Sequence, residues 1–270
     1  MPEYPEIRNL AQQMDGALRG KRITGVEVAN EKCLNLSVEN FSARVVGRTI
    51  EGAHWQGKWC FLRLGQGDRL ALNLNMGGNV VLYPPGQGPR EKWRVVLRFA
   101  DGDSLSVGFW FLGYLHWIGA GEPHPMTDKL GADPLADDFT FERFQGLLAG
   151  RKLPIKGLLL KQEHIAGIGN YYIQDILFQA RLHPMRAALS LTVEEQQRLY
   201  DAIRDRFALA LAQGGAWYEN DLYDEPGRFR EMLIGYKEGQ PCPQCHTPIQ
   251  KIKTGSTSGF VCPVCQPLQP

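Results

Sequence analysis

Four of the six cysteines lie in one short C-terminal segment, and their spacing constrains the fold more than any other feature. They form two Cys-x-x-Cys pairs, Cys242 with Cys245 and Cys262 with Cys265, separated by sixteen residues. Each pair directs two thiolates at one ion, and two pairs complete a closed, tetrahedral zinc site of the structural kind. Two disulfides are the alternative, but they need an oxidising compartment and the N-terminus lacks a signal-peptide pattern. We therefore predict one structural zinc ion.

Composition and charge define the class of protein but not its partner. The 270 residues are 43% hydrophobic and 22% charged, which excludes a disordered or fibrous chain. No run of about 18 apolar residues occurs, so we expect a cytoplasmic protein with no membrane partner. Thirty basic and twenty-nine acidic residues give a net charge of +1, so any surface for a polyanion has to be local. The remaining cysteines, Cys33 and Cys60, lie in apolar stretches and are expected to be buried, inert thiols.

The first 120 residues combine one helical pattern with many strand-like runs. Apolar residues between positions 7 and 18 recur with helical spacing, and Gly20 ends the pattern. From 23 to 118 short apolar runs alternate with turn sequences, which predicts an all-β sandwich or barrel. The next stretch, 121–138, is rich in proline and glycine and lacks periodicity, so we predict a linker there.

The pattern becomes helical beyond the linker. Residues 139–235 contain several amphipathic stretches, of which one begins at Asn170 and a longer one at the capping sequence Thr192-Val-Glu-Glu195. The cysteine segment follows, with a glycine- and serine-rich hairpin tip between its two pairs. We therefore predict a small helical domain at 139–235 and a zinc finger at 236–270.

Three segments, in this order, resemble the formamidopyrimidine-DNA glycosylase and endonuclease VIII family. They are the opening Met1-Pro-Glu-Tyr-Pro-Glu6, the segment Lys161-Gln-Glu-His-Ile-Ala-Gly-Ile-Gly-Asn-Tyr-Tyr172 that continues to Ala180-Arg-Leu-His-Pro184, and the four-cysteine finger. The resemblance implies an α+β multidomain fold: an N-terminal helix with a two-layer antiparallel β-sandwich, a helix-two-turns-helix DNA-binding domain and a zinc finger.

The same resemblance implies an activity and a partner. It indicates a base-excision-repair DNA glycosylase that removes damaged, in particular oxidised, bases and cleaves the abasic site through a Schiff base. The expected partner is double-stranded DNA that contains damaged bases or abasic sites. We expect a monomer that associates with the nucleoid when it acts on DNA.

Pro2 is the expected nucleophile. A small second residue permits removal of Met1, and the secondary amine left behind attacks a sugar aldehyde to form an iminium ion. Its place ahead of a helix favours the neutral amine, although a proline there is also simply a good helix start. By the resemblance, Glu3 is the general acid that opens the deoxyribose ring, and Lys58 contacts the lesion-strand phosphate and assists elimination. Without the resemblance, Glu3 is equally well explained as a first-turn carboxylate that complements the helix dipole, and Lys58 as an ordinary solvated lysine.

Four further residues are expected to contact DNA. Asn170 follows a Gly-Ile-Gly turn that lets backbone approach closely, and its helix N-terminus suits a phosphate; a plain N-cap is the alternative. Lys156 is a weaker phosphate candidate, since exposed lysines are common. The resemblance makes Met76 the side chain that enters the base stack when a base is flipped out. Lys92 is a candidate DNA contact because Arg90-Glu-Lys-Trp-Arg94 keeps basic character where many members of the family have a histidine-rich stretch.

Two departures from the family bear on the expected activity. Thr257 stands five residues before the third cysteine, where the family has an arginine. A hydroxyl cannot supply a charged bidentate contact, so β-elimination is expected to dominate over β,δ-elimination. Phe109-Trp-Phe-Leu-Gly113 replaces a Pro-Arg-Arg-Phe-Gly loop, and Phe111 or Leu112 could be a wedge or part of a core strand. These departures leave a lyase-only or non-catalytic lesion-binding relative as the alternative function, and a zinc-ribbon interaction protein as the third.

Overall fold

The computed structural model describes residues 1–89 and 92–268. Their contacts divide the chain into two compact units. The first comprises residues 1–128 and 211–229, and the second comprises residues 129–210 and those from 230 onward. By sequence the segment 211–229 falls in the predicted helical domain, but in the structure it packs with the N-terminal residues.

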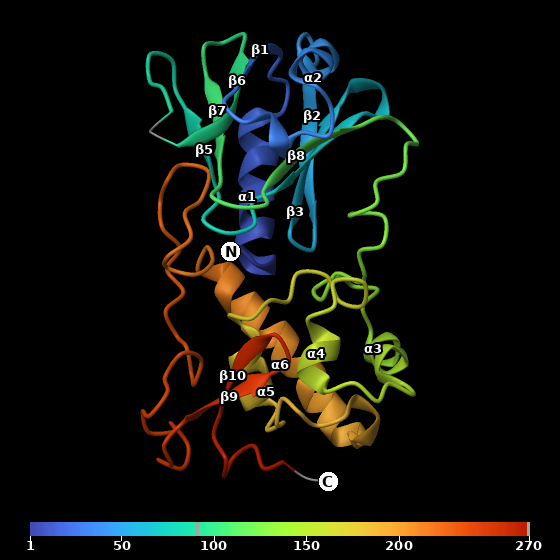
Figure 1. Ribbon diagram of the computed structural model, residues 1–270, viewed down its shortest axis with the longest axis vertical. Coiled ribbons are helices and arrows are strands. Elements are labelled where there is room, and N and C mark those ends of the chain that lie inside the picture. The colour runs from blue at the N-terminus through green and yellow to red at the C-terminus, as the bar shows by residue number, and fades with distance from the viewer. Residues whose placement is uncertain (90–91, 269–270) are drawn as a thin grey trace. The chain divides into compact units, whose positions relative to one another are not determined.

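The first unit contains a long helix and two antiparallel four-stranded sheets (Figure 1). Helix α1 spans Tyr4–Leu18. One sheet has the strand order β1-β6-β7-β5 and the other the order β2-β3-β4-β8, which confirms the predicted two-layer sandwich. The strands are β1 (Ile23–Val28), β2 (Ile50–Gln56), β3 (Trp59–Leu64), β4 (Arg69–Asn73), β5 (Asn79–Tyr83), β6 (Trp93–Phe99), β7 (Ser104–Gly108) and β8 (Tyr114–Ile118).

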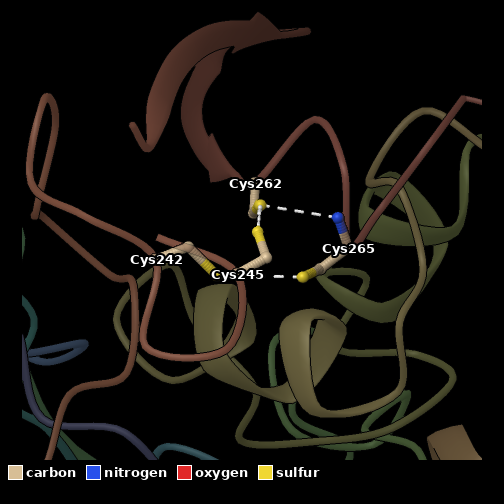
Figure 2. Close-up of side chains that lie close together, drawn as sticks. All are labelled: Cys242, Cys245, Cys262 and Cys265. Carbon is tan, nitrogen blue, oxygen red and sulfur yellow. Dashed lines mark hydrogen bonds between the residues drawn. The ribbon is translucent and has the colours of Figure 1, made fainter. Parts of the chain in front are cut away.

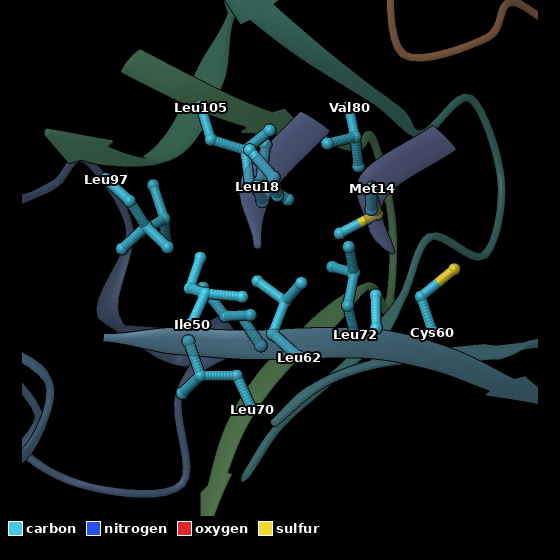
Figure 3. Packing of buried hydrophobic residues seen from close by; sticks show 14 of the residues in the cluster. Met14, Leu18, Ile50, Cys60, Leu62, Leu70, Leu72, Val80, Leu97 and Leu105 are labelled. Atoms are coloured by element: carbon cyan, nitrogen blue, oxygen red, sulfur yellow. The ribbon is translucent and has the colours of Figure 1, made fainter. Parts of the chain in front are cut away.

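The core of this unit lies between the sheets, and α1 contributes to it. Met14 and Leu18 of α1 are fully buried. Burial of each such side chain stabilises the fold by roughly 1.5–3 kcal/mol. The sandwich therefore holds α1 firmly, and α1 begins directly after the predicted catalytic residues Pro2 and Glu3. Figure 3 shows Met14 and Leu18 between the side chains of Val80, Leu97 and Leu105 of one sheet and Ile50, Leu62, Leu70 and Leu72 of the other.

One helix and one strand end in this unit differ from the sequence prediction. Helix α2 (Val38–Val45) interrupts the region expected to be all β. Ser37 caps it by accepting a hydrogen bond from the backbone N–H of Asn40 at 3.3 Å, a local signal that the strand-like runs around it obscure. Strand β7 ends at Gly108, so it does not include Phe111, for which a core strand is one of the two interpretations.

The second unit is helical in its first part. Its helices are α3 (Phe141–Leu148), α4 (Ile155–Leu159), α5 (Ile173–Gln179) and α6 (Val193–Ala212). Helix α6 begins as predicted, because Thr192 N–H donates to Glu195 Oε2 at 3.0 Å and Glu195 N–H donates to Thr192 Oγ1 at 3.2 Å. Helix α5 begins at Ile173, so Asn170 lies in the turn that precedes it. None of the helices in the described part of the chain is long and apolar enough to cross a membrane.

The finger is a hairpin attached to a small core of its own. Strands β9 (Gln250–Thr254) and β10 (Thr257–Val261) pair antiparallel, which confirms the predicted hairpin between the cysteine pairs. Two of the cysteines are buried in this core, which also includes a side chain of α5. Its buried members are Phe178, Ile234, Cys242, Ile249, Phe260 and Cys262.

Candidate functional site

Pro2, Glu3 and the first turn of α1 form a cluster of buried groups. Pro2 is buried, and Glu3, the N-cap of α1, has 2% of its surface exposed. The backbone N–H of Glu3 donates to Glu6 Oε2 at 2.8 Å, and the backbone N–H of Ala216 donates to Glu6 Oε1 at 2.8 Å. Glu6 therefore caps the helix and also ties it to the segment 211–229. The first bond fixes the backbone at Glu3, directly after Pro2.

Lys58 brings a cation to this cluster. It lies in the turn between β2 and β3, where Gly57 has a φ of 57° that glycine adopts without steric cost. Burial lowers the pKa of Lys58, and the carboxylates of Glu3 and Glu6 act in the opposite direction. The structure thus places Lys58 within electrostatic reach of the residue next to Pro2, so the three predicted catalytic residues share one region of the first unit.

No sequence motif marks the third carboxylate of the cluster, Glu219. Its Oε1 accepts a hydrogen bond from the α-ammonium of Met1 at 2.8 Å, and its side chain is only 10% exposed. Burial raises the pKa of Glu219, the hydrogen bond and charge of the terminal amine lower it, and the Glu3 carboxylate raises it. Glu219 is far from the N-terminus in sequence and reaches it only because the segment 211–229 packs with the first unit.

The loop after β7 presents apolar side chains to solvent. Phe109 is buried, whereas Phe111 and Leu112 are 66% and 69% exposed. Met76 is 53% exposed and pairs with Phe111 in an isolated β-bridge. The side-chain amide of Asn75 donates to the carbonyl of Leu112 at 3.1 Å, and the φ of Leu112 is 49°, a left-handed turn at the loop tip. This exposure excludes the core-strand interpretation, and Phe111 and Leu112 join Met76 on one apolar surface, here called the wedge surface.

A cavity of about 270 Å³ lies beside this loop. Lys92 and Glu219 are the charged residues of its lining. The predicted DNA contact Lys92 therefore lines the same cavity as the carboxylate that binds the N-terminal amine. Lys92 is exposed and has a φ of 76°. The complete lining is Gly77, Gly78, Asn79, Lys92, Gly108, Phe109, Trp110, Tyr218, Glu219 and Asn220.

The four cysteines of the finger converge as their spacing predicts (Figure 2). All four Sγ atoms lie within 4.8 Å of one another; Cys245 and Cys262 are 3.4 Å apart, and Cys242 and Cys265 are 3.8 Å apart. A tetrahedral site with Zn–S bonds of about 2.3 Å separates its sulfurs by about 3.8 Å. The donor set therefore fits one zinc ion, which would hold the finger together and leave no coordination position for water.

The other two cysteines are buried in the first unit. Cys33 and Cys60 are 2% and 0% exposed. Burial raises the pKa of Cys33 to about 11 and that of Cys60 to about 12, so both remain protonated thiols at neutral pH. The prediction that both thiols are buried is confirmed.

Lys156 lies under the finger hairpin and not at the surface. It is 1% exposed, and its Nζ donates to Thr254 Oγ1 at 2.8 Å, Thr257 Oγ1 at 3.1 Å and the carbonyl of Ser258 at 2.5 Å. Burial lowers its pKa to about 8. The expectation of an exposed lysine is therefore wrong. The hydroxyl of Thr257, which stands where the family has an arginine, is engaged by this ammonium group.

Asn170 is half-buried in the turn before α5. The N-cap of α5 is Tyr172, so the helix-opening position predicted for Asn170 is wrong. Gln174 Nε2 donates to the Asn170 carbonyl at 2.9 Å and to its Oδ1 at 3.1 Å, while Gln174 Oε1 accepts a hydrogen bond from the backbone N–H of Phe260 at 3.0 Å. Gln174 thus ties the Asn170 turn to the finger, a role that no sequence signal indicated. A phosphate contact by Asn170 stays a prediction.

Family models match three parts of the chain. Residues 1–108 match the formamidopyrimidine-DNA glycosylase N-terminal domain, and residues 130–220 match the H2TH domain of the same family. Residues 239–268 match the zinc finger found in FPG and IleRS. The three matches follow the order expected from the sequence motifs.

Whole-chain relatives and solved structures agree with these matches. Formamidopyrimidine-DNA glycosylases of Roseiflexus sp. (strain RS-1) and Chloroflexus aggregans are 35% and 34% identical, over 98% and 99% of this chain and 100% and 99% of theirs. The crystal structure of MutM (FPG) from Thermus thermophilus superposes with a TM-score of 0.89 at 30% identity, covering 100% of both chains. Lactococcus lactis Fpg, solved with DNA containing an abasic site, gives a TM-score of 0.90 at 28% identity over 98% of this chain and 99% of that one. The chain therefore belongs to the formamidopyrimidine-DNA glycosylase family.

Proposed function

We propose that the chain excises damaged bases from duplex DNA and cleaves the resulting abasic site, with Pro2 as the nucleophile once Met1 has been removed. The observation that carries this proposal is the chemistry gathered at the terminus. Pro2 is buried beside Glu3, the α-amine of Met1 ahead of it donates to Glu219, and Lys58 lies within electrostatic reach of Glu3. A nucleophilic amine needs groups that accept and return protons, and this cluster supplies them.

Each residue has a definite part in this chemistry. The Pro2 nitrogen attacks C1′ of the damaged nucleotide, the bond to the base breaks, and Glu3 protonates the ring oxygen so that the sugar opens as an iminium ion. Loss of a proton from C2′ then breaks the C3′–O bond and releases the 3′ phosphate, which is β-elimination. The lowered pKa of Lys58 increases its fraction of neutral amine, which suits a group that exchanges protons during elimination.

The wedge surface supports the DNA-binding part of the proposal. Flipping a nucleotide out of a duplex leaves a gap in the base stack, which an apolar side chain can fill. Met76 and Phe111 are exposed and paired, and Leu112 lies beside them at the loop tip. Lys92 contributes a positive charge to the cavity beside this loop. We assign these residues to the damaged duplex, and Asn170 to the phosphate backbone.

The finger supports DNA binding, and its zinc ion has a structural role. With zinc bound, the hairpin of β9 and β10 would present its tip to the DNA backbone. Thr257 takes the place of an arginine and its hydroxyl is engaged by Lys156, so the tip lacks a charged group there. This supports the prediction that β-elimination dominates over β,δ-elimination.

The DNA bound to two solved relatives suggests the lesions to try first. Lactococcus lactis Fpg was solved with DNA containing Fapy-dG, and MutM with DNA containing carbocyclic 8-oxo-G. We propose oxidised and ring-opened purines as the first substrates, acted on by a monomer in the cytoplasm at nucleoid DNA.

Borohydride trapping tests the proposal. The Met1-processed chain is incubated with duplex DNA carrying one abasic site, and borohydride reduces any iminium ion to a stable covalent adduct. The wild-type chain is expected to give the adduct, and Pro2→Ala is expected to give little or none because it removes the secondary amine. Absence of an adduct from the folded, zinc-loaded wild-type chain would contradict the proposal.

The wedge surface also favours a second candidate, a lyase without base excision. The loop offers apolar groups where many members have arginines, so a group expected to face the orphaned base is missing. A panel of oxidised purines, oxidised pyrimidines and abasic sites separates the two functions. Cleavage of abasic DNA without release of any damaged base would establish the lyase-only relative.

A further inference from the structure

Glu219 is placed to act directly on the terminal amine. In the structure its Oε1 lies 2.8 Å from the amine of Met1, and its side chain is 10% exposed. Glu219 also interacts electrostatically with Glu3. Pro2 lies between Met1 and Glu3 in the sequence, and both of these residues interact with Glu219. Removal of Met1 shifts the terminus by one residue, about 3.8 Å along the chain, and leaves it next to Glu3.

Glu219 also borders the cavity beside the loop that follows β7. The same side chain that holds the terminal amine lines this 270 Å³ cavity together with Lys92 and Asn220. A sugar aldehyde that enters the cavity would thus meet the carboxyl group that binds the terminal amine. Glu219 differs in this respect from Glu6, whose two carboxylate oxygens already accept backbone N–H groups of Glu3 and Ala216.

We propose that Glu219 is the proton carrier for the Pro2 amine, taking the proton that blocks attack and returning it to the departing hydroxyl group. This inference rests on the proposed function. The ammonium gives one proton to the Glu219 carboxylate and becomes a neutral amine. The amine nitrogen then bonds to the aldehyde carbon, and the proton left on nitrogen moves to the aldehyde oxygen. The Glu219 carboxyl group protonates the resulting hydroxyl, the C–O bond breaks, and water departs. The products are an iminium ion and the regenerated Glu219 carboxylate.

The charges around the amine suit this cycle. Among the described residues, the ionisable groups near Glu219 include Glu3 at the N-cap of α1, Glu6 on α1, Lys58 on the β2–β3 turn, and Lys92 and Tyr218 in the cavity wall. Burial raises the pKa of Glu219, which makes it a better proton acceptor than an exposed glutamate. Glu3 is then left to protonate the ring oxygen, so the two carboxyl groups divide the work.

The pH dependence of borohydride trapping on abasic DNA tests this assignment. Trapping rates are measured from about pH 5 to 9 for the Met1-processed wild-type chain, Glu219→Gln and Glu219→Asp. Glu225→Gln is the matched control, because Glu225 is an exposed glutamate on the same segment and its replacement removes the same charge. Circular dichroism and zinc content check that each variant is folded.

Two changes are expected together in Glu219→Gln. The plateau rate at high pH falls by about tenfold to a hundredfold, because the acid that expels water is missing. The midpoint of the rise in rate moves to lower pH by about half a unit to one unit, because the ammonium has lost its ionic partner. Glu219→Asp keeps the midpoint and recovers part of the plateau, and Glu225→Gln matches the wild type.

A purely structural role for Glu219 would lower the rate without moving the midpoint, and that result would overturn the assignment. So would a Glu219→Gln profile equal to the wild type. If the wild-type chain forms no adduct at all, the proposed function itself fails, and the two failures are therefore distinguishable.

Discussion

Replacing the buried Lys156 by methionine is expected to change how stability depends on pH. In the folded chain Lys156 donates to two threonine hydroxyls and one carbonyl under the finger hairpin, and burial lowers its pKa to about 8 from 10.5. Below about pH 8 both the folded and the unfolded states carry the proton. Between about pH 8 and 10.5 the unfolded state holds a proton that the folded state has released, so the wild-type chain gains unfolding free energy as pH rises.

The size of this gain follows from the shift. Each pH unit of difference is worth about 1.36 kcal/mol, so the wild type gains at most about 3 kcal/mol across the window, and Lys156→Met has no matching gain. Methionine keeps much of the stem volume and removes the charge, but it leaves three acceptors without this donor. At pH 7 removal of the buried charge stabilises the variant, whereas loss of the hydrogen-bond donor destabilises it. The pH dependence of the difference in unfolding free energy between wild type and variant isolates the effect of the charge.

Chemical denaturation followed by far-UV circular dichroism measures this difference. The tryptophans all lie in the first unit, whereas the helices α3 to α5 lie in the second, so circular dichroism is the better reporter of the unit that holds Lys156. Lys152→Met is the matched control, because Lys152 is exposed. A wild-type minus Lys156→Met difference that stays constant from pH 7 to 10.5 would refute the account of a desolvated ammonium group.

Three further perturbations test other parts of the structure. Asp175→Asn should lower the unfolding free energy by about 3 kcal/mol. The buried carboxylate forms an ion pair with Arg206 at 3.0 Å and accepts hydrogen bonds from the backbone N–H groups of residues 233–235. An unchanged Tm in thermal unfolding would contradict this prediction. Zinc removal by a strong chelator should abolish DNA binding and expose the finger amides to hydrogen exchange, and unchanged exchange in residues 250–261 would argue against a zinc-dependent hairpin. Phe111→Ala should weaken binding to abasic DNA about tenfold while intact-duplex binding changes little, which a parallel titration of both duplexes would check.

The scaffold was predictable because its signals are local and repeated. The apolar stripe of α1 has helical spacing, and the side chains that make it up are those buried in the sandwich, such as Met14 and Leu18. The capping pair Thr192 and Glu195 forms both of its expected hydrogen bonds at the start of α6. The four cysteines converge because each Cys-x-x-Cys pair fixes its own geometry before the two pairs meet.

Contacts between distant segments were not predictable in the same way. Nothing in the sequence around Glu219 indicates that it meets the chain terminus, since that contact depends on the path of residues 211–229. Lys156 resembles any surface lysine in sequence, and only the hairpin above it explains its burial. The exposure of Phe111 likewise depends on where β7 ends, a boundary that an uninterrupted apolar run conceals. In each case tertiary packing decides the outcome.

Peptide mapping of the borohydride-trapped adduct tests the central claim most directly. The account predicts that the reduced sugar is attached to the nitrogen of Pro2 in an N-terminal peptide that lacks Met1. An adduct on Lys58 or another lysine, or an active chain whose N-terminal peptide still begins with Met1, would contradict it.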